Sequence, residues 1–218
     1  MIWSDHLKDF PPSGHALFSP SQPAWMNDQT AEDAVSRYYK SLAVTIGTLV
    51  HEEAHDCIIT NTRYTKKEAK KALIKKLLLN YIPRNAFDEE YLASNFVNYV
   101  NDAIGFMMRS EQRLFYSKWC AGTADAIIFE ESKKILRIHD LKTGIIPGKM
   151  AQLEGYAALF FLEYGKLLGV TPGDCQIILR IYQDGEVTEE FPTAENILPI
   201  MDSIIWHTQL MQSIEETT

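Results

Sequence analysis

Cysteine is scarce in this 218-residue chain, which contains only Cys57, Cys120 and Cys175. Their odd number and wide separation argue against a disulfide framework, and no CxxC pair offers ligands for zinc or an iron–sulfur cluster. We therefore expect the protein to work in a reducing compartment, the cytoplasm.

Long apolar runs are absent as well. The sequence has no run of eighteen or more apolar residues, which is about the length that crossing a bilayer requires, so we expect no membrane association. The N-terminal segment MIWSDHLKDFPPSGH has neither the basic start nor the apolar stretch of a signal peptide.

Positive charge is in deficit, with 21 Lys and Arg against 29 Asp and Glu and a net charge of −8. Nucleic-acid binding is usually accompanied by a basic surface, which this balance does not supply overall. However, residues 63–76 read RYTKKEAKKALIKK, so an acidic protein could still present one basic face. Two interpretations of this segment are equally good: its lysines contact DNA phosphates along a groove, or they lie on a helix face in contact with water. The lysines concerned are Lys66, Lys67, Lys70, Lys71, Lys75 and Lys76.

Hydrophobic residues make up 46% of the chain, enough for a sizeable core, and we expect one α/β domain over residues 1–218. Apolar periodicity changes from helical to strand-like after about residue 110 and then alternates. Gly47–Thr48 is expected to interrupt the first helix or to start a new one. The expected parts are an N-terminal arm (1–30), a mainly helical part (31–110), a sheet core (111–192) containing a helix (149–168), and a C-terminal helix (194–213).

The segment GTADAIIFEESKKILRIHDLKTG reads as a β-hairpin with a polar turn at Ser132–Lys133. In a symmetric hairpin Asp125 then lies opposite Asp140, and like charges at directly opposed positions are destabilising. Both aspartates have apolar neighbours, and a chain tolerates such a pair when a cation lies between the carboxylates. The turn lacks an Asn-Gly signal, so a shifted register stays open.

Lys142 follows Asp140 by two residues, so both side chains should point to the same face of the strand. A lysine beside paired carboxylates at a metal site can hold or activate the water that attacks phosphorus. A surface ion pair is the plainer interpretation of such a spacing taken alone. Gln152 and Tyr156 share a face of the following helix, and a helix surface with a buried tyrosine would also explain them.

Four segments together resemble the RecB-like branch of the PD-(D/E)XK nucleases: GTLVH (47–51), GTAD (122–125), DLKTG (140–144) and QLEGY (152–156). They occur in the order and approximate spacing of that family, which includes the CRISPR-associated adaptation nucleases and many phage proteins. The stretch ALFSPSQPAW also looks like phage members that begin with an SPS-type segment. The resemblance covers roughly residues 17–160.

The resemblance implies a fold with a small mixed β-sheet flanked by helices, and a role for each matching residue. His51, Asp125, Asp140 and the backbone carbonyl of Leu141 would bind the metal. Lys142 would be the catalytic lysine, and Gln152 and Tyr156 would orient DNA or that lysine. This oxygen-rich set with one imidazole suits Mg²⁺ or Mn²⁺ better than a dedicated zinc site.

The resemblance also implies the activity and the partners. We expect a DNA nuclease, more specifically an exonuclease in phage recombination, repair or replication, with DNA and a recombination or replication protein as partners. Several relatives bind an iron–sulfur cluster through four cysteines. This chain has three dispersed ones, so no cluster is expected. Strand preference, polarity and oligomeric state stay open.

Other interpretations of the same residues remain. HEEAH (51–55) matches the HExxH helix of zinc proteases, but that hypothesis leaves the other motifs unexplained. A nuclease fold retained as an inactive DNA-binding or inhibitor module is a second alternative. Glu52, Glu53 and Glu111 are candidates for groups around the metal or for a second metal. Base stacking is conceivable for four aromatic residues, although core packing explains them better: Trp25, Phe106, Phe115 and Trp119.

Overall fold

The computed structural model describes residues 17–21 and 23–217. Residues 1–16 and 22 of the expected N-terminal arm, and with them part of the SPS-type segment, lie outside the described residues. The rest of the arm contains the 3₁₀ helix η1 (Pro23–Asn27). In the described part of the chain, no helix combines the length and the hydropathy that crossing a bilayer requires.

The helical part consists of α1 (Ala31–Ile59), α2 (Lys66–Leu79), the 3₁₀ helix η2 (Arg84–Ala86) and α3 (Glu89–Gly105). Capping boxes start α1 and α2, where Thr30 and Thr65 each bond reciprocally with the residue three positions later. The expected break at Gly47–Thr48 is wrong, because α1 runs through it. A Cβ on Gly47 would lie 3.2 Å from Oγ1 of Thr143, so the glycine allows the helix to approach the end of a strand.

Five strands form one mixed sheet in the order β1-β2-β3-β4-β5. Only β3 and β4 are parallel, and helix α4 (Met150–Leu168) makes the crossover that such a pair requires. The 3₁₀ helix η3 (Pro172–Asp174) precedes β4, and α5 (Ala194–Glu216) ends the chain. The strands are β1 (Arg109–Ser117), β2 (Cys120–Glu130), β3 (Ile135–Leu141), β4 (Gln176–Gln183) and β5 (Glu186–Glu190).

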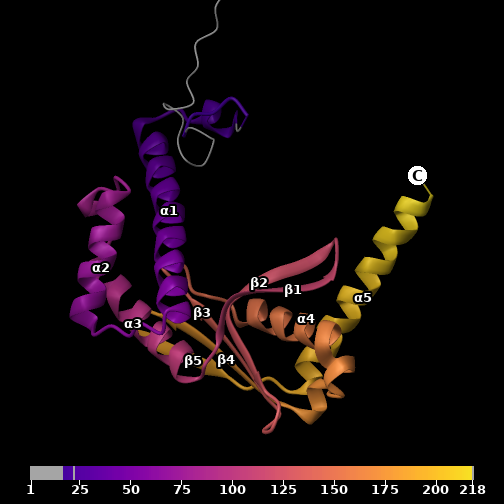
Figure 1. Cartoon of the computed structure of the whole chain (residues 1–218). Helices are drawn as coiled ribbons and strands as arrows, with labels where there is room; N and C mark the ends of the chain where they lie inside the picture. The colour runs from indigo at the N-terminus through magenta and orange to yellow at the C-terminus, as the bar shows by residue number, and fades with distance from the viewer. Residues whose placement is uncertain (1–16, 22, 218) are drawn as a thin grey trace, which may run out of the picture.

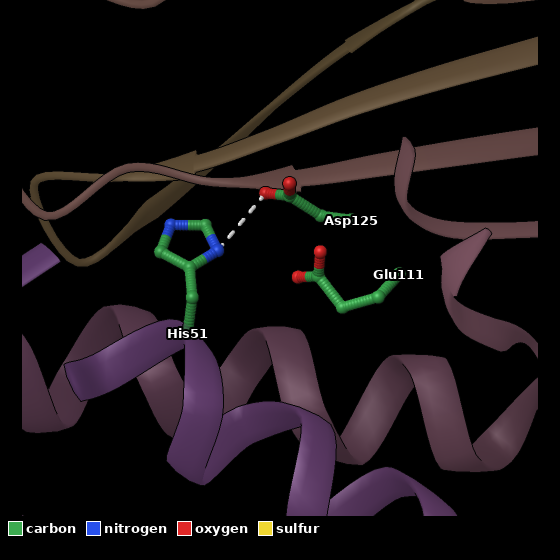
Figure 2. Close-up of side chains that lie close together, drawn as sticks. All are labelled: His51, Glu111 and Asp125. Atoms are coloured by element: carbon green, nitrogen blue, oxygen red, sulfur yellow. Dashed lines mark ion pairs between the residues drawn. The ribbon is translucent and has the colours of Figure 1, made fainter. Parts of the chain in front are cut away.

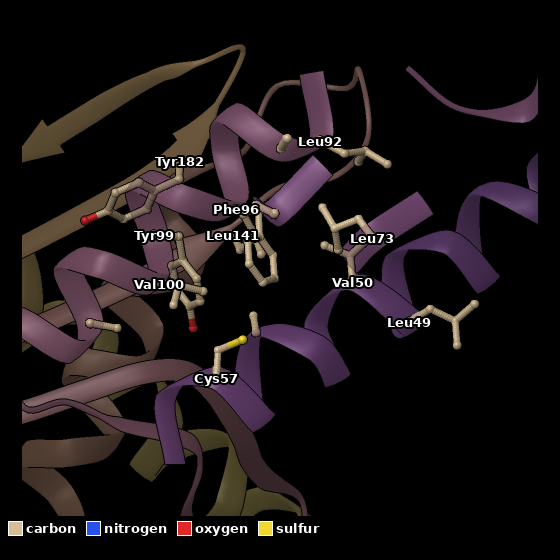
Figure 3. Close-up of a cluster of buried hydrophobic side chains, with 14 of the residues drawn as sticks. Leu49, Val50, Cys57, Leu73, Leu92, Phe96, Tyr99, Val100, Leu141 and Tyr182 are labelled. Atoms are coloured by element: carbon tan, nitrogen blue, oxygen red, sulfur yellow. The ribbon is translucent and has the colours of Figure 1, made fainter. Parts of the chain in front are cut away.

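Helices cover both faces of this sheet (Figure 1). Side chains of α1, α2 and α3 form one core, in which Phe96 and Tyr99 pack near Leu141 and Tyr182 of the sheet (Figure 3). Helices α4 and α5 form a second core on the opposite side. The expected α/β class, with a mixed sheet flanked by helices and an N-terminal helical part, is confirmed.

The register of the β2–β3 hairpin is also confirmed. Ala126 pairs with His139 and Ile127 with Ile138, and continuing this antiparallel register places Asp125 opposite Asp140. The candidate site residues of the hairpin are therefore at its open end, next to the start of α4.

Candidate metal centre and lysine site

Three carboxylates form a row across neighbouring strands. On β1 and β2, Ser110 pairs with Ala126 and Gln112 with Ala124, so Glu111 occupies the position opposite Asp125. Asp140 follows on β3. Glu111 and Asp125 are the two that meet, and like charges at directly opposed positions are unfavourable without a counter-charge.

Strand β2 changes its orientation at this row. Ala124 belongs to the core against α4, whereas Ala126 belongs to the core against α1 and α3, although both have even numbers. In a regular strand these two residues would lie on the same face. The change lets Asp125 reach the α1 side while Asp140 remains near α4.

His51 extends from α1 toward the row. Its Nδ1 lies 3.5 Å from Oδ2 of Asp125, and one ligand atom each of His51, Glu111 and Asp125 lie within 4.8 Å of one another (Figure 2). We call these three residues the His51 group. They line a cleft of about 530 Å³ together with α1 residues that include Glu52 and His55.

Burial makes the Asp125 carboxylate costly to ionise. Desolvation raises its pKa to about 6; nearby His51 opposes this shift, and Asp140 adds to it. The Leu141 N–H donates to Oδ2 of Asp125 at 3.0 Å and favours the ionised form. A cation in the cleft would act in the same direction as this hydrogen bond.

Glu111 has a backbone conformation that non-glycine residues rarely adopt, with φ = 52°. Such a conformation costs on the order of 1 kcal/mol and clusters at functional sites. The sequence named Glu111 only as a peripheral candidate. The structure places it in the His51 group, at the point where β1 reaches Asp125.

Lys142 connects the remaining predicted residues. Its Nζ donates a hydrogen bond to Oδ1 of Asp140 at 3.1 Å. It also lies 2.9 Å from Oδ2 of the same carboxylate, which is an ion-pair contact whose geometry is not that of a hydrogen bond. The same Nζ donates to Oε1 of Gln152 at 3.0 Å, and Nε2 of Gln152 donates to the Tyr156 hydroxyl at 3.2 Å. The prediction that Asp140 and Lys142 share a face is confirmed.

Gly122 of the GTAD segment allows α4 to approach β2. A Cβ at Gly122 would lie 2.8 Å from Cε1 of Tyr156, closer than real Cβ atoms approach another atom. The first residue of one motif thus makes room for the last residue of another. We call the hydrogen-bonded series Asp140–Lys142–Gln152–Tyr156 the Lys142 chain, and its Tyr156 end is held against the sheet.

The expected ligand set is assembled only in part. His51 and Asp125 meet, but their third neighbour is Glu111, while Asp140 is neutralised by Lys142. Leu141 contributes its N–H to Asp125. A role for the Leu141 carbonyl as a metal ligand stays a prediction.

Three of the six lysines of α2 form ion pairs, and one of them, Lys76, pairs with Glu52 and Glu53 of α1. Lys66 and Lys70 form ion pairs with Glu90, and Lys70 also pairs with Glu89. Within the described part of the chain, no ion pair involves the exposed lysines at helical i, i+4, i+8 spacing, which are Lys67, Lys71 and Lys75. DNA contact therefore remains a prediction chiefly for these three.

Other candidates have less to do with the site. His55 lines the same cleft as His51 but is outside the His51 group, and exposed Glu52 lies 3.7 Å from Lys76. Core packing was the wrong expectation for Phe115 and Trp119, which are 56% and 37% exposed. The other two of the four aromatic candidates are half-buried: Trp25 packs against Phe18, and Phe106 packs against His139.

Comparisons with models of known protein families, with curated proteins and with solved structures gave no match. The arrangement of the His51 group and of the Lys142 chain is therefore the basis for the function proposed below.

Proposed function

We propose that this protein is a metal-dependent deoxyribonuclease of the PD-(D/E)XK type, which hydrolyses phosphodiester bonds in DNA. One observation carries the proposal: the His51 group and the Lys142 chain are linked at the open end of one hairpin. Asp125 accepts the N–H of Leu141, and Leu141 lies between Asp140 and Lys142 in the chain. A cation site and a fixed ammonium group thus adjoin each other.

The donor atoms of the His51 group fit Mg²⁺ or Mn²⁺. Two carboxylates and one imidazole offer hard oxygen ligands and a nitrogen ligand that Mn²⁺ accepts well. A bound ion would lower the pKa of a water molecule and neutralise charge that develops on the phosphate. The strained backbone of Glu111 supports the proposal, because it brings a second carboxylate to Asp125 despite their repulsion.

Lys142 is the catalytic residue in this proposal. A lysine ammonium group has three N–H donors. One is directed to Asp140 and one to Gln152, so a third remains for a phosphate oxygen or for the attacking water. Asp140 keeps the ammonium group charged and in place, and Gln152, held by Tyr156, fixes its direction.

The form of the activity rests on the resemblance of four motifs to the RecB-like nucleases. It favours an exonuclease in phage recombination, repair or replication that acts in the host cytoplasm. DNA is the substrate in this proposal, and a recombination or replication protein is the expected partner.

The test is digestion of end-labelled linear and circular DNA, both single- and double-stranded, with Mg²⁺ or Mn²⁺ and with EDTA. We expect metal-dependent loss of linear DNA that disappears in Lys142→Ala. The matched control is Lys166→Ala, which removes an exposed lysine at the far end of α4 and should leave digestion unchanged.

Two results would contradict the proposal. Wild-type protein that shifts DNA on a gel but leaves every substrate intact would indicate a binding module. Digestion that persists in Lys142→Ala would remove Lys142 from the chemistry.

A further inference from the structure

Two large apolar side chains are exposed beside the lysine site. Ile145 and Ile146 are 88% and 80% exposed, in the loop that leads from Lys142 to α4. Single exposed apolar residues are common on protein surfaces and need no explanation. Here two such residues are adjacent, and they stand next to a candidate catalytic group.

The backbone of this loop is held in place. The Gln183 side-chain amide donates to the carbonyls of Gly144 at 2.7 Å and Ile146 at 2.9 Å, and its oxygen accepts the N–H of Gly148 at 2.9 Å. The Tyr91 hydroxyl also donates to the Gly144 carbonyl at 2.8 Å. The isoleucines are therefore displayed by an anchored backbone, and part of the entropy of ordering the loop is already lost before a ligand arrives.

One cleft joins the loop to the site. It measures about 520 Å³, and its lining includes Lys142, Lys149 and Gln152 together with Ile146 and Pro147. One part of its wall is cationic and polar and the other part is apolar. A nucleotide has the matching chemistry, with an anionic phosphate beside a flat base whose faces are apolar.

The base of a nucleotide inside an intact duplex cannot meet this apolar wall, because its neighbours cover both faces. Only a terminal, single-stranded or unstacked base exposes a face. Isoleucine is one of the apolar side chains that proteins insert between base steps, and inside a duplex this insertion has an energetic cost of unstacking, which an unstacked base does not require.

We infer that Ile145 and Ile146 pack on the base of the nucleotide next to the phosphate that Lys142 contacts. The substrate class is then a DNA strand with unstacked bases, either a single strand or a frayed end. This inference rests on the proposed nuclease function and adds to it a determinant of strand preference. Gln183 is a positioning residue for the loop.

The test compares a normal single-stranded oligodeoxynucleotide with the same strand carrying abasic sites at its terminal nucleotides. The variant Ile145→Ser/Ile146→Ser removes the two exposed isoleucines, of which Ile146 lines the cleft and Ile145 stands beside it. Leu167→Ser is the control, since it removes a side chain that is 82% exposed near the far end of α4. Cleavage is measured as kcat/KM, and binding is measured by fluorescence anisotropy in the Lys142→Ala background with Mg²⁺.

We expect the double variant to lose about tenfold in kcat/KM and in affinity for the normal strand, and little for the abasic strand. Leu167→Ser should match wild type on both strands. An equal loss on both strands, or no loss on either, would overturn the inference, while cleavage by wild type would still uphold the nuclease. If wild type does not cleave, the nuclease fails, and the loop is judged by whether base-dependent binding is lost in the double variant.

Discussion

Two polar clusters lie at the sheet, one beside α1 and one beside α3, and they differ in how their charges are balanced. The first is the His51 group. The second, which we call the Asp102 network, contains Asp102, His139, Arg180 and Tyr182. In this network the Tyr182 hydroxyl donates to Oδ2 of Asp102 at 2.7 Å, and Nη1 of Arg180 donates to the same oxygen at 2.9 Å.

The Asp102 network supplies its own counter-charge. Asp102 meets the Arg180 guanidinium and the Tyr182 hydroxyl, and Nε of the same guanidinium also pairs with Glu189. The Tyr182 oxygen lies 3.0 Å from Nδ1 of His139. Burial, with Arg180 and Arg137 nearby, lowers the pKa of His139 to about 3, so this histidine stays neutral. These hydrogen bonds stabilise the fold, although Nε2 of the buried His139 has no partner among the described residues.

The His51 group places two carboxylates beside one imidazole, and Asp140 on the next strand is already neutralised by Lys142. Carboxylates and a histidine occur in both clusters, so residue types alone do not separate a structural network from a binding site. The balance of charge differs between them, and it supports the proposed cation site in the His51 group.

The largest contrast is expected in catalysis. Asp125→Asn should reduce metal-dependent DNA cleavage on the order of 10²- to 10³-fold, because it removes a charge that would hold the metal near the phosphate. Asp102→Asn makes the same carboxylate-to-amide change outside the His51 group, and it should change the cleavage rate by less than about threefold. Initial rates on labelled linear DNA at saturating Mg²⁺ measure both. Equal losses would mean that the two clusters are not functionally distinct.

Stability in EDTA should show the opposite order. Asp102→Asn should lower the free energy of unfolding by about 1–3 kcal/mol, since it weakens the bonds to Arg180 and Tyr182. Asp125→Asn should leave that free energy unchanged or raise it at pH 8, because it removes a partly buried charge. Urea unfolding followed by circular dichroism measures the change, and destabilisation by Asp125→Asn would contradict the assignment.

The pH dependence of stability should separate the clusters as well. The folded pKa of Asp125 lies above its ordinary value of 3.8, so between about pH 4 and 6 the folded state binds the extra proton and stability falls as pH rises. The folded pKa of His139 lies below its ordinary 6.5, so over the same range the unfolded state binds the extra proton and stability rises with pH.

Each effect amounts to about 1.4 kcal/mol per pH unit for one proton. Relative to wild type in EDTA, Asp125→Asn should therefore make the free energy of unfolding rise more steeply with pH, and His139→Gln should make it rise less steeply. Urea unfolding at half-unit pH steps tests both slopes. Parallel curves for wild type and both variants would refute the assignment of these protons.

The smallest expected effect concerns backbone strain. Glu111→Gly should raise the free energy of unfolding by about 0.5–1 kcal/mol, because glycine adopts a positive φ without steric cost. The same variant should weaken Mn²⁺ binding, measured by calorimetry. Lys134→Gly is the matched control: its φ is also 52° in the turn of the β2–β3 hairpin, so it should stabilise without a change in Mn²⁺ affinity.

The sequence predicted one hairpin of the site and missed the other for a physical reason. The β2–β3 turn is symmetric, so counting residues gave the correct register for Asp125 and Asp140. In the β1–β2 hairpin the register shifts between Phe115 and Ser117. If the β1–β2 turn were symmetric about residues 118–119, Gln112 would lie opposite Asp125. The one-residue shift in register places Glu111 there instead.

Tertiary contacts account for other differences. Gly47 weakens a helix locally, but its contact distance to Thr143 shows that the missing side chain serves the packing of α1 on the sheet. Local patterns also gave no sign of the bonds from Gln183 to the loop of Ile145 and Ile146, because these join positions about 40 residues apart.

Helix α1 also has a mechanical consequence. His51 is 20 residues beyond Ala31, which at 1.5 Å per residue corresponds to about 30 Å, and the N-terminal half of the helix extends past the sheet (Figure 1). Near Gly47 the helix rests closely on Thr143. This contact lies one turn before His51, so a force on the N-terminal end of α1 would tilt the helix about it. The His51 imidazole would then move relative to Asp125, and the affinity of the proposed metal site would change.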